Sequence, residues 1–128
     1  MAVVTIFVAN MDRAVQFYTE VLGLKLVYRF GNDWASLKTD DGMNVGLHPA
    51  SKESPAGRKG SITIGFEVSE SMRKVVAAMK ERGVKFVSPI VDDKEIKAAH
   101  FEDPDGNEMY FVEAQQQWKD YDRTKATV

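Results

Sequence analysis

The two halves of this chain are related by an internal repeat, which limits the folds open to it. Shifting the sequence by 60 residues, the separation of Gly23 and Gly83, also places the apolar run ending at Val8 on the run ending at Val68. A shift of 64 residues, the separation of Gly42 and Gly106, aligns the later parts of the two halves. Repeated units of this size do not bury a sheet face alone and must stack or pair to form a core. We therefore predict two copies of one unit.

Each copy is predicted to contain one strand, one helix and three further strands. Residues 3–8 alternate in a β-branched run that ends at Asn10, a favourable N-cap residue. Apolar residues recur at helical spacing from Met11 to Leu22, and Gly23 then ends the predicted helix. Three alternating runs separated by hairpin-type turns follow at 24–30, 34–38 and 43–48. The first half thus has the pattern β-α-β-β-β.

These patterns predict a single α+β domain over residues 1–113. It consists of two tandem βαβββ modules, at about 1–48 and 61–113, joined by an exposed linker at 49–60 that is rich in Ser, Lys, Pro and Gly. Residues 114–128 are predicted to be a polar C-terminal extension, helical or loose. Trp118 and Tyr121 of this extension are expected to dock on the domain.

The composition limits the classes of partner. With 128 residues, 44% of them hydrophobic, the chain is long enough for one domain with a core. The 17 basic and 19 acidic residues give a net charge of −2, so we expect neither a nucleic-acid partner nor attraction to an anionic membrane. The absence of cysteine excludes disulfides, thiolate metal sites and cysteine nucleophiles and suits a reducing compartment. The N-terminal apolar run is too short for a signal peptide or a membrane span, and a cytoplasmic location is expected.

Two motifs resemble those of the vicinal oxygen chelate superfamily, the glyoxalase, bleomycin-resistance and dioxygenase family. Residues 8–24, VANMDRAVQFYTEVLGL, resemble its first strand-to-helix unit, and residues 101–107, FEDPDGN, resemble its last hairpin. The resemblance covers about residues 3–113 and implies curved mixed sheets around a cleft. The sequence DPDG is physically a tight turn and marks a hairpin, not a catalyst. Because one fold can host several chemistries as well as simple binding, the function has to be inferred from the cleft.

The resemblance also identifies the positions where a metal would be bound. Metal-containing members take two ligands from the first strand of each unit and two from the last; here these positions are Val3, Thr63, Gly46 and Tyr110. Valine and glycine offer no ligand atom, threonine is a poor ligand, and a tyrosine binds metals well only after losing its proton. We therefore expect no metal and no other cofactor at this site, as in the metal-free, bleomycin-resistance-like members.

Strand alternation predicts which residues face the cleft. The set facing the helices is almost purely apolar, whereas the opposite set mixes aromatic and polar side chains, as small-molecule pockets do. Gly46 and Gly65 are expected to leave room for a ligand. The predicted ligand-binding residues are Phe7, Trp34, His48, Thr63, His100 and Tyr110. The leading hypothesis is therefore a protein that binds a small, partly aromatic molecule and breaks no bond.

Other interpretations of the same residues stay open. A divalent-metal lyase, isomerase or dioxygenase could use a displaced site built from His48 and His100 with Glu67 or Glu108. A metal-independent enzyme could use His100 or Glu67 as a general base. Glu67 and Glu108 could instead neutralise a cationic ligand. A structural or regulatory dimer without a ligand is the last alternative.

A homodimer is expected in every case, because the resembling family commonly pairs its units and two-fold dimers are the commonest oligomers. The sequence leaves open whether the two modules pair within one chain or across chains.

Overall fold

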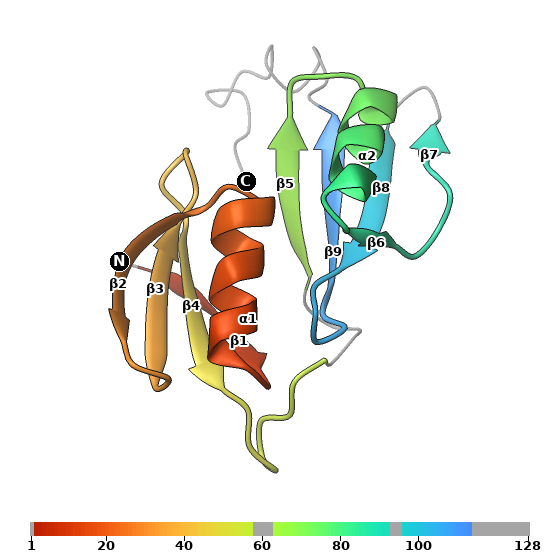
Figure 1. Cartoon of the computed structure of the whole chain (residues 1–128). Helices are drawn as coiled ribbons and strands as arrows, with labels where there is room; N and C mark the ends of the chain where they lie inside the picture. Colours follow the sequence, from red (N-terminus) through yellow and green to blue (C-terminus); the bar gives the residue numbers. More distant parts are fainter. Residues whose placement is uncertain (1, 58–62, 93–95, 114–128) are drawn as a thin grey trace, which may run out of the picture.

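The computed structural model describes residues 2–57, 63–92 and 96–113, and it contains two mixed sheets with matching strand order (Figure 1). The first sheet has the order β1-β4-β3-β2 and the second the order β5-β9-β8-β6, with β7 also paired to β8. In each sheet the first and last strands of the module lie parallel and the remaining pairs are antiparallel. The predicted α+β fold and its repeated unit are thus confirmed.

The elements of the first module follow the predicted order. They are β1 (Val3–Val8), α1 (Met11–Gln16), the π-helical turn η1 (Phe17–Val21), β2 (Lys25–Phe30), β3 (Trp34–Lys38) and β4 (Asn44–Pro49). The Asn10 side chain accepts a hydrogen bond from the Arg13 N–H, as expected of an N-cap residue.

The predicted helix over 11–22 changes its hydrogen-bonding pattern half-way. From Phe17 the turns widen, so that the Leu22 N–H donates to Phe17 O at 3.0 Å, a spacing of five residues. The Thr19 hydroxyl donates to Val15 O at 2.7 Å and satisfies a carbonyl in the widened turn. Apolar periodicity indicates the helix but cannot reveal such a local change.

The second module differs from the first in one strand. Its elements are β5 (Ile64–Val68), α2 (Met72–Glu81), β6 (Lys85–Phe86), β7 (Val91–Asp92), β8 (Lys97–Glu102) and β9 (Glu108–Glu113). The counterpart of β2 is divided into the short strands β6 and β7, and Pro89 stands between them. Because proline has no N–H to donate, it interrupts a sheet ladder.

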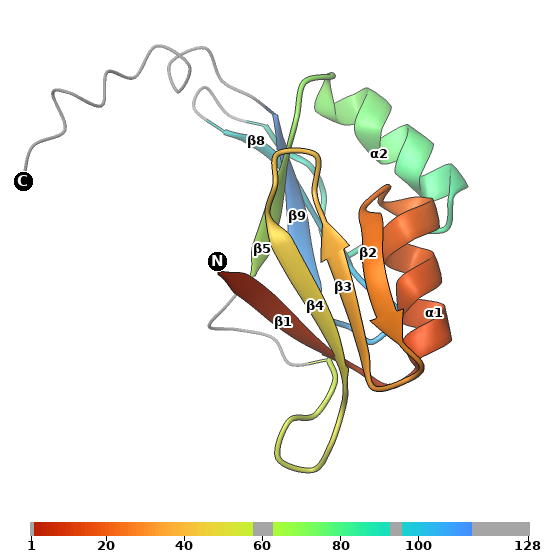
Figure 2. The same ribbon diagram turned by 90° about the vertical axis from the view of Figure 1, so that its left-hand side faces the viewer.

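Helices α1 and α2 lie on the same side of the two sheets, and the opposite side carries no helix (Figure 2). Within the described ranges, no helix has the length and apolar character needed to span a bilayer. The predictions for Trp118, Tyr121 and residues 58–60 of the linker concern residues outside the described ranges.

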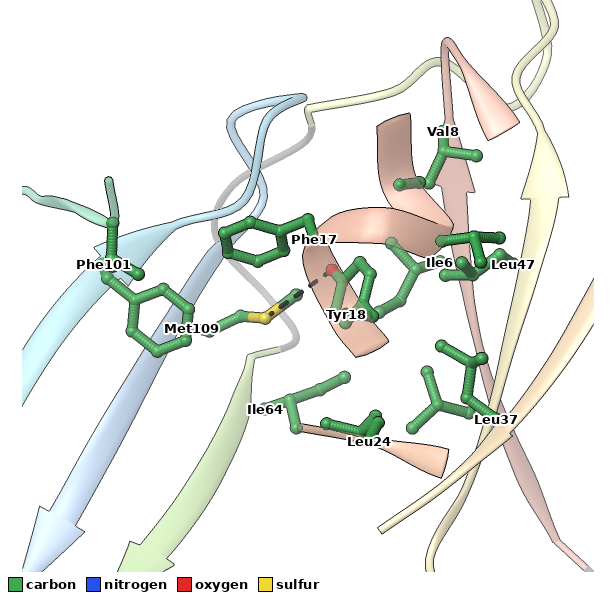
Figure 3. Close-up of a cluster of buried hydrophobic side chains, with 14 of the residues drawn as sticks. Ile6, Val8, Phe17, Tyr18, Leu24, Leu37, Leu47, Ile64, Phe101 and Met109 are labelled. Atoms are coloured by element: carbon green, nitrogen blue, oxygen red, sulfur yellow. Dashed lines mark hydrogen bonds between the residues drawn. The ribbon is translucent and has the colours of Figure 1, made fainter. Parts of the chain in front are cut away.

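The core lies between the sheets and the helices and joins the two modules (Figure 3). The sheet residues predicted to face the helices are buried or half-buried, as strand alternation requires. Tyr18, Leu37 and Phe101 are fully covered. Tyr18 comes from the first module, yet its hydroxyl lies 3.7 Å from the sulfur of Met109 in the second.

A buried carboxylate next to Tyr18 organises the hairpin before β9. Asp103 is 5% exposed, and its Oδ2 accepts hydrogen bonds from the Tyr18 hydroxyl and the Asn107 side chain, both at 2.8 Å. Its Oδ1 accepts from the N–H groups of Asp105 at 3.0 Å and Asn107 at 2.8 Å. Burial, and next the Asp103 carboxylate, raise the pKa of Tyr18 well above its ordinary value, so the phenol stays protonated and donates.

The same hairpin holds the start of the first helix. Asp105 Oδ1 accepts a hydrogen bond from the Ala9 N–H at 3.1 Å and pairs with the Arg13 guanidinium at 2.9 Å. The DPDG motif is therefore a contact between the modules as well as a turn.

Candidate functional site

The open side of the first sheet carries an aromatic cluster formed by Phe7, Trp34 and His48. Phe7 of β1 lies beside His48 of β4 in the strand register, and their rings are 5.6 Å apart between centroids. The Trp34 ring from β3 approaches His48 at 6.3 Å. Three of the predicted ligand-binding residues are thus brought together on one surface.

The second sheet carries a smaller group on its open side. His100 of β8 lies beside Tyr110 of β9, with ring centroids 5.5 Å apart. His100 Nδ1 is also 3.5 Å from Glu108 Oε1, and both side chains are about one-third exposed. The two groups are close enough to form an ion pair when the imidazole is protonated.

Gly46 and Gly65 do not leave room for a ligand, contrary to the expectation from sequence. A Cβ on Gly46 would lie 2.1 Å from Trp34 Cη2, and a Cβ on Gly65 would lie 2.2 Å from Tyr110 Cζ. Each glycine therefore allows an aromatic ring of the neighbouring strand to lie flat against the sheet. The space expected at these positions is filled by Trp34 and Tyr110.

A cleft of about 510 Å³ lies between the edge strands β1 and β5; we call it the seam cleft. It is lined by Val3, Val4, Thr5, Ile6, Phe7, Glu53, Ser54, Pro55, Thr63, Ile64, Asn107, Glu108 and Met109. Of the predicted ligand-binding residues, it brings Phe7 and Thr63 together. Thr63 also fixes the base of the cleft, since its hydroxyl donates to the Glu108 carbonyl at 2.8 Å.

The other predicted residues border the seam cleft without lining it. His48 and Trp34 continue from Phe7 across the first sheet, while His100 contacts the lining residue Glu108. Tyr110 lies next to His100. The predicted ligand-binding residues therefore lie in the seam cleft and on the sheet surfaces on either side of it.

Sequence reasoning missed the contribution of the linker. Glu53, Ser54 and Pro55 line the seam cleft although residues 49–60 read as an exposed connection. No periodicity or motif in this segment indicates that it returns to the edge of β1. Glu67 lies elsewhere, in a second cleft further along β5 that it shares with Asp40 and Asp41.

The residues at the family's metal positions do not fit a metal ion. Val3 offers no donor atom, and Gly46 is covered by the Trp34 ring. The Thr63 hydroxyl is engaged with a backbone carbonyl, and the Tyr110 ring lies against Gly65.

A displaced metal site also lacks a donor set in the described ranges. No three His, Asp or Glu side chains are arranged there to hold a metal ion. The pair His100 and Glu108 supplies two donors, whereas His48 belongs to the other sheet. Catalytic zinc sites, by comparison, take three protein ligands and leave the fourth position open.

Comparison with known proteins identifies the family. A family model described as the Glyoxalase/Bleomycin resistance protein/Dioxygenase superfamily matches residues 1–111. The chain belongs to this superfamily. The resemblance of the two sequence motifs to this superfamily is therefore confirmed. Membership alone does not indicate an activity, because one fold can host several chemistries.

Solved structures of the superfamily fold align with most of the chain. An integron cassette protein from the mobile metagenome of Halifax Harbour sewage outfall has a TM-score of 0.72 and 23% identity, covering 89% of this chain and 97% of its own. An antibiotic binding protein from Streptomyces sp. CB03234 has a TM-score of 0.72 and 21% identity, covering 88% and 93%. Lactoylglutathione lyase from Agrobacterium tumefaciens has a TM-score of 0.69 and 16% identity, covering 89% and 92%. No curated protein matches the chain.

Proposed function

We propose that the protein binds a small, partly aromatic molecule in the seam cleft without the help of a metal ion. The observation that carries this proposal is the cleft itself. Its volume of about 510 Å³ lies within the range of roughly 300 to 1,000 Å³ that is usual for small-molecule sites. Most of its lining surface is apolar, and a few polar groups are supplied by Thr5, Glu53, Ser54, Thr63, Asn107 and Glu108.

The aromatic surfaces beside the cleft support the same proposal. Phe7 lines the cleft, and His48 and Trp34 extend its aromatic surface beyond the lining, so a planar ligand that projects from the cleft meets their rings. Offset or edge-to-face contacts between aromatic rings stabilise by about 0.5 to 1.5 kcal/mol beyond their buried area. Glu108 of the lining offers a hydrogen-bonding group, and His100 lies 3.5 Å from it outside the lining.

Binding is favoured over metal-dependent catalysis by the donor chemistry of the site. The positions at which metal-containing members carry ligands are a valine, a covered glycine, an engaged threonine and a tyrosine. One structural relative is an antibiotic binding protein, and binding of a small molecule on the same fold agrees with the proposal. The expected homodimer and cytoplasmic location stay predictions.

Replacing Phe7 by alanine is expected to weaken ligand binding about tenfold or more. The change removes the ring that connects the seam cleft to the aromatic cluster, and a loss of about 1.4 kcal/mol of contact corresponds to a factor of ten in Kd. The measurement is a fluorescence titration with 2-naphthalenemethanol, a neutral aromatic probe.

The matched control for this titration is Phe30→Ala. Phe30 lies on β2 of the same sheet, is 66% exposed and does not line the cleft. This variant is expected to keep the affinity of the unchanged protein. Equal weakening by both substitutions would place the binding outside the seam cleft, and absence of binding to the unchanged protein would refute the proposal for this class of ligand.

A further inference from the structure

The charged groups of the seam cleft have one sign. Glu53 of the linker and Glu108 of β9 line it from two elements, and the described part of the lining contains no Lys, Arg or His. Glu108 is 37% exposed, and His100 Nδ1 lies 3.5 Å from its Oε1. The lining beside it includes the apolar residues Ile64 and Met109 as well as Asn107. A carboxylate next to apolar surface interacts more strongly with an opposite charge than one in open water.

A second acidic cleft lies further along the same edge strand. It has a volume of about 530 Å³, follows β5 from Gly65 to Val68, and contains Asp40, Asp41 and Glu67. Its described lining likewise holds no basic side chain. The seam cleft takes Ile64 of β5 and the second cleft takes Gly65 to Val68, so both lie along this edge strand.

The clustering of acidic side chains in the two clefts does not follow from the overall composition. Five of the 19 acidic residues line the two clefts, which leaves 14 for the rest of the chain against 17 basic residues. The remainder therefore carries an excess of positive charge, while the seam carries negative charge. Clefts lined by one sign of charge focus the electrostatic potential and attract ligands of the opposite sign.

We propose that the molecule bound in the seam cleft is an organic cation, a ring system that carries a protonated amine. Its ring lies against Phe7 and the apolar lining, and its ammonium group lies beside the carboxylates of Glu108 and Glu53. The second acidic cleft adds to the negative potential along the seam. This inference rests on the proposed function and specifies the chemical class of its ligand.

The test compares three probes that share one ring and differ in charge: 2-naphthylmethylamine, 2-naphthalenemethanol and 2-naphthoate. Each is titrated into the full chain near pH 7. The amine is expected to bind at least tenfold more tightly than the alcohol, and the carboxylate is expected to bind more weakly than either. Raising the salt concentration is expected to reduce the preference for the amine, because salt screens charges near the surface.

Substitutions of single carboxylates locate the interaction. Glu108→Gln and Glu53→Gln are each expected to reduce the affinity for the amine several-fold and to reduce the affinity for the alcohol much less, because glutamine keeps a hydrogen-bonding group and loses only the charge. Glu81→Gln, the same substitution at an exposed residue at the end of α2, is the matched control and is expected to change neither. Melting temperatures of all variants are compared, so that a folding defect is recognised.

The possible outcomes separate this inference from the proposed function. If the alcohol or the carboxylate binds as tightly as the amine, the inference is overturned and the proposed function stands. If the amine is preferred but neither glutamine variant reduces its affinity, the inference is also overturned, because the charge then acts elsewhere. If none of the three probes binds, the proposed function fails and the inference fails with it.

Discussion

Replacing Phe101 by alanine is expected to lower the free energy of unfolding by about 3 to 5 kcal/mol, the usual cost of truncating a buried phenylalanine. Phe101 of β8 has no exposed surface, and its ring stacks on Phe111 with centroids 4.5 Å apart and planes 17° from parallel. Phe66 and Phe86 complete the cluster at 6.4 and 6.2 Å from Phe101. The close packing prevents neighbouring side chains from filling the cavity.

Urea denaturation of the two proteins measures this loss. The control is Phe30→Ala, which removes an exposed ring and is expected to change the stability by no more than about 0.5 kcal/mol. A loss at Phe101 as small as that at Phe30 would mean that the second sheet does not pack as described.

Replacing Asp103 by alanine is expected to cost about 3 kcal/mol or more. The substitution removes the acceptor of four hydrogen bonds, from the Tyr18 hydroxyl, the Asn107 side chain and the N–H groups of Asp105 and Asn107. A buried donor left without a partner costs about 1 to 3 kcal/mol, so loss of two or more partners accounts for the expected effect.

The matched control is Asp33→Ala in the exposed turn between β2 and β3. It is expected to have a small effect, because Asp33 is exposed and contributes only a backbone hydrogen bond to its turn. Urea denaturation compares both variants with the unchanged chain. Equal effects at the two positions would contradict the assignment of the DPDG hairpin as a junction between the modules.

Much of the fold is predictable because its rules are local. The alternation of Leu37 and Leu47 with polar neighbours marks the face of the sheet that the helices cover, and both are fully buried. The separation of Gly23 and Gly83 indicates the repeat, because each glycine follows a helix with a positive φ that favours this residue. Such signals need no knowledge of distant contacts.

The features that sequence could not indicate depend on contacts between distant segments. Trp34 covers Gly46 only because the register of β3 and β4 places their positions close together and the ring turns across the sheet. The return of Pro55 to the edge of β1 likewise depends on tertiary packing. Strand alternation alone therefore predicts empty space at Gly46, whereas in the structure the Trp34 ring fills it.

Titration of chelator-treated protein with 2-naphthalenemethanol, before and after addition of nickel or zinc, shows whether binding depends on a metal ion. The neutral probe separates this question from the charge of the ligand. We predict that the stripped protein binds the probe and that its Kd changes less than about twofold when metal is added, because Val3, Gly46, Thr63 and Tyr110 offer no fitting donor set. Loss of binding in the stripped protein, restored by one equivalent of metal, would contradict the account.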